Sequence, residues 1–251
     1  MSADQKPTVS NQLPTWLIPG SALISDAVLD KKDREDALVA DKTFRNSRFC
    51  DCVLELSTFQ RCNFINCDFK GCSFKEAVFE DCHFCEDETG SVWRYCELSK
   101  ASFRRCNISL NKFIGCEAYG LTLEDCSAQG VKFDLNVHRK IATKTMFGGL
   151  TAEKCKLQYA DFSSMDLTES RLESCDLRDA NFAGCGLSHA SLRGSALNNA
   201  DFSEAVLDGA ILAHASFDQI DFAAMGSHRR VVVSSDQHEN ILASMGIVTL
   251  D

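Results

Sequence analysis

Residues 157–222 read LQYADFSSMDLTESRLESCDLRDANFAGCGLSHASLRGSALNNADFSEAVLDGAILAHASFDQIDF, and every fifth residue of this stretch is Phe or Leu. The series runs from Leu157 to Phe222 without a break. A second, usually small, side chain stands two positions before each of these residues, as in Ala160-x-Phe162. Chance does not hold one phase for so long, so this period predicts the fold.

A period of five fits neither an uninterrupted α-helix, with its period of 3.6, nor an uninterrupted β-strand, with its period of 2. It fits a short extended segment followed by a corner, because side chains two apart in an extended segment point the same way. The small residue and the Phe or Leu would both point inward, and the three polar positions would face water. Each coil then buries its apolar residues only against its neighbours. We therefore predict an all-β solenoid.

The same phase runs through two earlier stretches, which extends the predicted solenoid over residues 37–226. Its inward positions there are Phe44, Phe49, Leu54, Phe59, Phe64, Phe69, Phe74, Phe79 and Phe84, followed by Leu98, Phe103, Ile108, Phe113, Ala118, Leu123, Ala128 and Phe133. The chain has 14 cysteines, and all but Cys50 and Cys85 occupy the small inward position. We interpret them as small core residues. Zinc ligands would need two closely spaced pairs, and none is identifiable.

The sequence predicts no catalytic residue, no cofactor and no metal site. The six histidines are scattered, and no Ser/His/Asp grouping, glycine-rich nucleotide loop or pair of acidic residues is identifiable. A narrow solenoid filled by Phe and Leu would also leave no interior cavity for a substrate. Many reduced thiols without a signal peptide indicate a reducing cytoplasm. No apolar stretch approaches the roughly 20 residues of a membrane span.

The phase breaks twice, and we predict a loop at each break. Phe84 and Leu98 are fourteen positions apart instead of fifteen, and so are Phe133 and Phe147. We place the loops at about 85–95 and 134–146, with Phe147 in phase with the core again. Such loops are either tolerated insertions or the recognition elements of a rigid rod.

Charge distinguishes the second loop from the coils on its carboxyl-terminal side. Residues 136–156 hold five basic and one acidic side chain, whereas 157–225 hold three and eleven. The net charge of the whole chain is −10. An acidic surface of this size serves solubility, or it imitates the backbone of a nucleic acid.

The two ends do not follow the repeat. Residues 1–36 contain three prolines, and we predict an irregular segment with a helix over Ser25–Val39. Residues 227–251 predict a short strand at Arg229–Val233 and then a helix capped by Ser234 or Ser235, with Gln237 as the capping-box partner of Ser234. This helix would cap the last coil, and its remaining apolar residues could pair with a second copy of the chain. These residues are Ile241, Leu242, Met245 and Ile247.

The repeat resembles that of the pentapeptide-repeat family, A-(D/N)-(L/F)-x-x, as in Ala180-Asn181-Phe182-Ala183-Gly184. That resemblance implies a right-handed, four-sided β-helix with one pentapeptide per side and about eight coils. Several segments are similar to the gyrase-protecting branch, which includes quinolone-resistance (Qnr) proteins and microcin- and albicidin-immunity proteins. They are Ala128–Phe133 with Ile141–Phe147, Leu157–Phe162, the loop after Phe84, and Ile241–Val248. The chain departs from the Qnr pattern at Met146, where Trp is found, and at Gly148.

The resemblance implies a homodimeric DNA mimic that binds DNA gyrase, with topoisomerase IV as a further partner, and neither nucleic acid nor membrane directly. It places the contact to gyrase on the larger loop, at Arg139, Lys140, Ile141, Lys144, Met146 and Phe147. The smaller loop would contribute Glu86, Asp87 and Glu88, and the acidic surface Asp161, Asp166, Asp176 and Asp201. The alternatives are a scaffold or secreted effector without a topoisomerase role, and a purely regulatory gyrase inhibitor.

Overall fold

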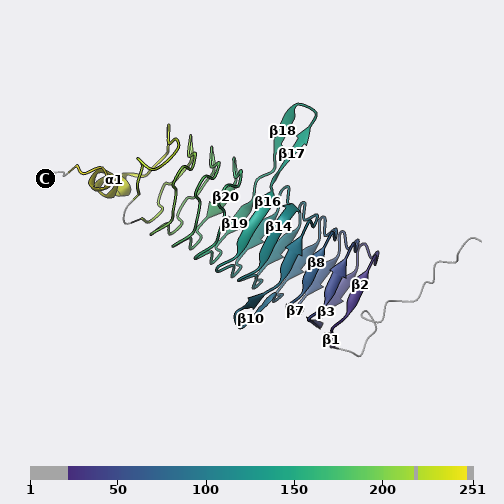
Figure 1. Ribbon diagram of the computed structural model, residues 1–251. Helices are drawn as coiled ribbons and strands as arrows, with labels where there is room; N and C mark the ends of the chain where they lie inside the picture. Colours follow the sequence, from purple (N-terminus) through teal and green to yellow (C-terminus); the bar gives the residue numbers. More distant parts are fainter. Residues whose placement is uncertain (1–21, 218–219, 248–251) are drawn as a thin grey trace, which may run out of the picture.

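Short parallel strands stack into a rod in the computed structural model, which describes residues 22–217 and 220–247 (Figure 1). The predicted β-solenoid is confirmed, because strands one coil apart pair in parallel register with inward residues opposite each other. Phe44 pairs with Phe64, for example, and Phe49 with Phe69.

Three sides of the rod contain sheets in which successive coils contribute neighbouring strands. The first contains β1 (Leu23–Ser25), β4 (Thr43–Arg45) and β7 (Asn63–Ile65). The second contains β2 (Val28–Asp30), β5 (Arg48–Cys50), β8 (Asp68–Lys70), β12 (Val92–Arg94), β14 (Lys112–Glu117) and β16 (Lys132–Asn136). The third contains β3 (Leu38–Ala40), β6 (Thr58–Gln60), β9 (Val78–Glu80), β13 (Ser102–Arg104), β15 (Thr122–Glu124), β19 (Thr151–Glu153) and β20 (Arg171–Glu173). Isolated bridges such as Asp33 to Val53 form the fourth side.

Beyond β20 the coils continue as single bridges between successive turns, such as Asp161 to Asn181 and Asn181 to Asp201. The backbone groups are still paired between coils. The N–H of Phe162 donates to the carbonyl of Asn181, and the N–H of Asn181 donates to the carbonyl of Ala160, both at 2.9 Å.

Each corner is turned by a residue in the left-handed region, two positions after the inward Phe or Leu. Asn46 has φ of 51°, Ser164 of 61° and Glu204 of 60°. Residues branched at Cβ are strongly disfavoured at positive φ. No Val, Ile or Thr has positive φ within the described ranges, so the outward positions must meet a backbone requirement as well as a solubility one.

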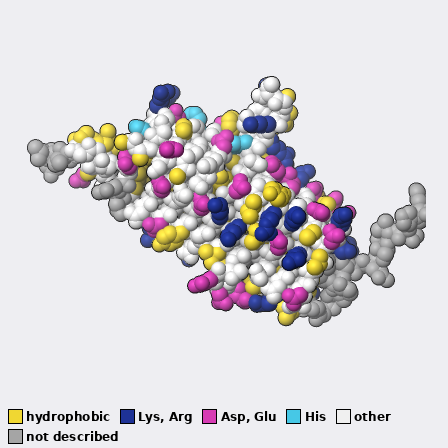
Figure 2. Space-filling model, in the orientation of Figure 1, with side chains coloured by type: hydrophobic (Ala, Val, Ile, Leu, Met, Phe, Trp, Pro, Cys, Tyr) yellow, Lys and Arg dark blue, Asp and Glu magenta, His cyan; other side chains and the backbone are white. Residues whose placement is uncertain are grey.

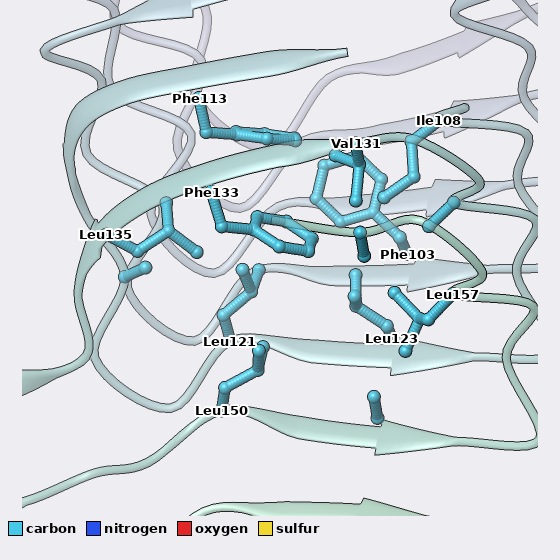
Figure 3. Packing of buried hydrophobic residues seen from close by; sticks show 14 of the residues in the cluster. Phe103, Ile108, Phe113, Leu121, Leu123, Val131, Phe133, Leu135, Leu150 and Leu157 are labelled. Atoms are coloured by element: carbon cyan, nitrogen blue, oxygen red, sulfur yellow. The ribbon is translucent and has the colours of Figure 1, made fainter. Parts of the chain in front are cut away.

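The inward side chains form one buried cluster along the rod, part of which is shown in Figure 3. Aromatic rings of successive coils stack in parallel, with the centroids of Phe44 and Phe64 5.1 Å apart and those of Phe162 and Phe182 5.0 Å apart. The inward cysteines are buried and free, as interpreted from the repeat. The thiol of Cys106 donates to the carbonyl of Phe79 at 3.3 Å. Burial raises the pKa of the Cys67 thiol to about 12, so that thiol is unreactive.

The predicted helix over Ser25–Val39 is wrong, because β1, β2 and the start of β3 occupy this segment. The solenoid therefore begins near residue 22 instead of residue 37. Ile24, Leu29 and Val39 keep the five-residue phase, but Arg34 occupies the position between the last two. Residues 1–21, which complete the predicted irregular extension, lie outside the described residues.

The smaller loop is a hairpin of β10 (Cys85–Glu86) and β11 (Thr89–Gly90), shorter than the predicted 85–95. Trp93 follows it as a fully buried core residue that pairs with Phe69 and Phe113. Trp93 stands 24 positions after Phe69, where an undisturbed coil takes 20. The phase break is therefore an insertion of four residues, not the loss of one.

The larger loop is a hairpin of β17 (His138–Ile141) and β18 (Lys144–Phe147), which projects from the rod in Figure 1. The repeat resumes at Ala152, which pairs with Leu123. The expectation that Phe147 re-enters the core is wrong, since its side chain is 44% exposed.

The carboxyl end consists of a 3-10 helix, η2 (Ser235–Gln237), and a helix, α1 (His238–Ser244). Val232 makes one bridge, to Ile211, in place of the predicted strand. The backbone N–H of Ser234 donates to Oε1 of Gln237 at 2.8 Å, which is the predicted side-chain half of the capping box. Ile241 packs against the core, so α1 covers the last coil.

Candidate functional site

The larger hairpin has two faces, because residues opposite each other on its strands share a face. Arg139 lies opposite Met146 and Ile141 opposite Lys144, while His138 lies opposite Phe147 and Lys140 opposite Thr145. The six predicted contact residues are thus divided, with Arg139, Ile141, Lys144 and Met146 on the first face and Lys140 and Phe147 on the second.

The first face is anchored to the preceding coil. The Arg139 guanidinium lies 5.0 Å from the centroid of the Tyr119 ring, and its Nη2 atom lies 3.8 Å from Oε1 of Glu97. Gly148 allows this arrangement, because a Cβ atom there would stand 2.5 Å from the Tyr119 ring. The departure from the Qnr pattern at Gly148 is therefore explained by close packing against Tyr119.

The second face is anchored to the following coil. The His138 ring packs edge-on against Phe147 at 5.1 Å, and its Nε2 atom lies 3.4 Å from Oδ1 of Asp166. A groove of about 740 Å³ lies beside it, lined by residues that include Lys140, Thr145 and Ser163 as well as His138 and Asp166.

The hairpin exposes apolar side chains beside cations. Ile141 is 59% exposed, and Met146 and Phe147 are each 44% exposed. Lys140 and Lys144 are also exposed, and neither forms an ion pair within the described part of the chain. Exposed apolar groups gathered on a projecting element are typical of protein-binding surfaces.

The smaller hairpin is less acidic than its sequence suggests. The Arg45 guanidinium pairs with both carboxylate oxygens of Glu86, with Nη2 2.8 Å from Oε1. This hydrogen bond lowers the pKa of Glu86. The charge of Glu86 is therefore balanced by Arg45 of the rod. Asp87 and Glu88 remain as the exposed acidic residues of the smaller hairpin without this pairing.

The four predicted acidic residues do not form one patch, because they lie on three sides of the rod. Asp161 and Asp201 continue the side of β16, Asp166 lies on the next side, and Asp176 on another. Each carboxylate accepts the backbone N–H two residues ahead, at 3.0 Å for Asp161 and 2.9 Å for Asp201. These residues therefore stabilise their own corners, a role that the sequence interpretation missed although Asp and Asn share the position for this reason.

Two of these charges are balanced by neighbours. Arg178 lies 2.6 Å from Asp176, and its hydrogen bond lowers the pKa of that carboxyl. Lys132 lies 3.4 Å from Asp161. Asp201 has no ion-pair partner among the described residues, and hydrogen bonds from Ser203 lower its pKa.

The predicted dimer residues differ in exposure. Ile241 and Leu242 are half-buried, whereas Met245 is 61% and Ile247 48% exposed. A groove of about 270 Å³ beside α1 is lined mostly by apolar residues, among them Phe222 and Val233.

Neither a metal centre nor a membrane helix is found in the described ranges. No three His, Cys, Asp or Glu residues there are grouped so that they could hold a metal ion. No helix in those ranges is long and apolar enough to cross a membrane.

A model of pentapeptide repeats matches the chain in eight copies, over residues 43–75, 62–86, 151–184 and 185–222. No curated protein sequence matches it significantly. Full-length QnrB1, a plasmid-mediated fluoroquinolone resistance protein, has a similar structure with a TM-score of 0.63 and 24% identity over 90% of this chain and 100% of that one. A trypsin-treated QnrB1 variant has a TM-score of 0.65 and 23% identity, over 86% and 99% of the two chains. HetL, a pentapeptide-repeat protein involved in heterocyst differentiation regulation in the cyanobacterium Nostoc, has a TM-score of 0.50 and 16% identity, over 85% and 90%.

Proposed function

Because this chain is a pentapeptide-repeat protein, we propose that it protects a bacterial type II topoisomerase, DNA gyrase foremost, from poisons that trap the enzyme on cleaved DNA. The observation that carries the proposal is the β17–β18 hairpin, a projecting element with exposed apolar and basic side chains on an otherwise regular rod. QnrB1, whose fold is similar, is a fluoroquinolone resistance protein. Quinolones are therefore the first poisons to test.

In this proposal the rod and the hairpin have separate roles. The carboxyl-terminal coils, with an excess of eight acidic residues over 157–225, would occupy a groove that normally holds DNA. Asp201, which has no ion-pair partner in the described ranges, would contribute more to this field than Asp161 or Asp176. The hairpin would contact the enzyme through Ile141, Met146 and Lys144, which share one face.

A second copy of the chain would extend the rod. Met245 and Ile247 are large apolar side chains left exposed beside the groove at α1. Burying such groups is favourable by about 25 cal/mol per Å² of apolar surface. We propose that two chains pair there, which places the two hairpins on either side of the dimer centre.

Gyrase supercoiling in the presence of a panel of poisons, quinolones first, tests the proposal. We expect the protein to restore supercoiling and to bind purified gyrase. Replacing Ile141 and Met146 together by Ser should reduce rescue about tenfold or more, because two exposed apolar side chains that would contact the enzyme are lost. The matched control is Leu56→Ser, which removes an apolar side chain of similar exposure from the rod itself.

Three results would argue against the proposal. No rescue from any poison together with no binding would favour a scaffold or effector role. Inhibition of supercoiling at all concentrations would favour a purely regulatory inhibitor. An equal loss of rescue with Leu56→Ser would mean that the hairpin is not specifically required for protection.

A further inference from the structure

His138 stands at the root of the large hairpin in an unusual environment. Its side chain is only 9% exposed, and neither ring nitrogen makes a hydrogen bond within the described residues. Buried polar side chains nearly always have a hydrogen-bond partner, so the groups that surround this imidazole decide what it can bind. The nearest candidate partner is Asp166, whose Oδ1 atom is 3.4 Å from Nε2.

The other charged groups around this imidazole either bind other partners or, like Lys140, lie on the hairpin itself. Glu117 and Asp134 line the same groove, but Glu117 accepts a hydrogen bond from Asn136 and Asp134 one from the backbone of Gly115, both at 2.9 Å. Lys132, also in the lining, pairs with Asp161. Lys140 is two residues along β17, on the same face as His138.

Asp166 is suited to hold a cationic partner. Burial opposes its ionisation, but the hydrogen bonds from Thr168 and the electrostatic effect of the nearby imidazole outweigh that effect and lower the pKa of the carboxyl. The backbone N–H of Thr168 donates to Oδ1 at 3.1 Å, and its hydroxyl donates to the same atom at 2.7 Å. Asp166 therefore remains a fixed carboxylate while the imidazole gains or loses its proton.

We propose that His138 is the positioning residue of the hairpin, which it holds against the following coil through Asp166 when its imidazole is protonated. Histidine is the side chain that commonly ionises near neutral pH. A protonated ring forms a charge-assisted bond to Asp166 of the following coil, whereas a neutral ring lacks this bond and keeps only its contact with Phe147, which lies within the hairpin. The hairpin is therefore held more tightly at lower pH, where the imidazole is protonated, than at higher pH.

The contacts on the opposite face of the hairpin, made by Arg139, do not depend on pH. Arg139 stays charged at every relevant pH, so its contacts with Tyr119 and Glu97 do not change. The hairpin would therefore pivot about the Arg139 side when His138 loses its proton. This inference rests on the proposed function in one respect only: the orientation of the hairpin would serve to present Ile141 and Met146 to the partner.

Hydrogen exchange of the isolated full-length protein tests the clamp without any topoisomerase. After correction for the intrinsic effect of pH, we expect the amides of 138–147 to be roughly threefold to tenfold better protected at about pH 6 than at about pH 8, the range of an ion pair to a partly buried group. In Asp166→Asn and in His138→Phe, which keeps the ring contact with Phe147, this difference should vanish. Asp201→Asn, a carboxylate far from the hairpin, is the matched control and should keep it.

Nuclear magnetic resonance titration of the His138 ring supplies the second readout. Asp166→Asn should lower the pH at which the ring loses its proton, and Asp201→Asn should not. The inference is overturned if the protection of 138–147 has the same pH dependence in the native protein and in Asp166→Asn, or if the titration of His138 is unchanged. If the pH-dependent protection is found but the protein does not rescue gyrase, the proposed function is refuted and this inference stands.

Discussion

The two halves of the rod share one backbone repeat but are built from different side chains. Up to Phe113 the coils contain three-residue strands, stacked phenylalanines and cysteines, whereas after β20 they contain single bridges and mostly leucine and alanine. Their surfaces differ as well, since Lys and Arg gather over the amino-terminal half of the face seen in Figure 2 and are sparser beyond the hairpin.

Charge is closer to balance in the first half, where residues 43–135 hold 11 basic and 14 acidic side chains, than in the second. One corner of the first half carries alternating Asp41, Arg61, Asp81 and Arg105, and the Arg61–Asp41 and Arg105–Asp81 pairs are each 2.7 Å apart. The second half has eight more acidic than basic residues over 157–225. The comparison teaches that the five-residue period determines the backbone, while the outward positions are free to carry a different property in each half.

Replacing one inward ring should show the largest difference between the halves. Phe64 and Leu177 occupy the same side of the rod, and Phe64 packs against Phe44 and Phe84 in parallel stacks. We expect Phe64→Ala to lower the free energy of unfolding by about 4 kcal/mol and Leu177→Ala by about 3 kcal/mol. Urea denaturation followed by circular dichroism measures both. Equal losses would mean that aromatic stacking adds nothing to the first half.

A smaller effect should follow the loss of one inward thiol. Cys106→Ala removes a buried sulfur and its bond to the Phe79 carbonyl, and we expect a loss of about 1 to 2 kcal/mol in the same assay. Cys85→Ala, at a partly exposed site, is the control and should change little. If both variants are equally stable, the cysteines are not acting as core residues.

The smallest effect is expected at the acidic corners. Asp201→Ala should lower the free energy of unfolding by at most about 1 kcal/mol, because the N–H of Ser203 loses its acceptor. Asp201→Asn should be nearly neutral, since Asn181 makes the same bond on the same side of the rod.

The same position gives a pH dependence with a definite sign. The pKa of Asp201 is lowered in the folded protein, so its contribution is present above its unfolded pKa and is lost as pH falls through the folded one. Asp201→Asn should remove this part of the acid sensitivity. An acid unfolding curve that is unchanged in that variant would contradict this role of Asp201.

The inward positions could be predicted from the sequence because burial in a solenoid forces one residue in five to be apolar. The size of each insertion could not be predicted, since a gain of four residues, as at the smaller loop, a gain of nine, as at the larger loop, and a loss of one all shift the phase equally. Only strand pairing distinguishes an insertion from a loss. For this reason the repeat alone does not identify Trp93 as a core residue, and it wrongly assigns Phe147 to the core. The repeat also hides the first coil, because Arg34 interrupts the apolar series.

The hairpin that carries the candidate site could be located from the sequence, but its geometry could not. The reversed charge of 136–156 indicated the larger loop, and Arg139, Ile141 and Met146 lie on its projecting hairpin. The division of the hairpin into two faces, and the clamp at His138, depend on contacts with Tyr119 and Asp166 in other coils. No local pattern in the chain encodes those contacts.

Gln237 closes the last turn in a way that bears on filament growth. A stack of open coils presents unpaired carbonyl groups at its end, onto which another chain could add without limit. The buried Gln237 amide donates to the carbonyls of Leu212 and Ala215, at 2.8 and 2.6 Å, and so occupies the Ala215 acceptor that the backbone of a further coil would need. This one side chain therefore prevents the stack of coils from continuing unchanged beyond its last turn.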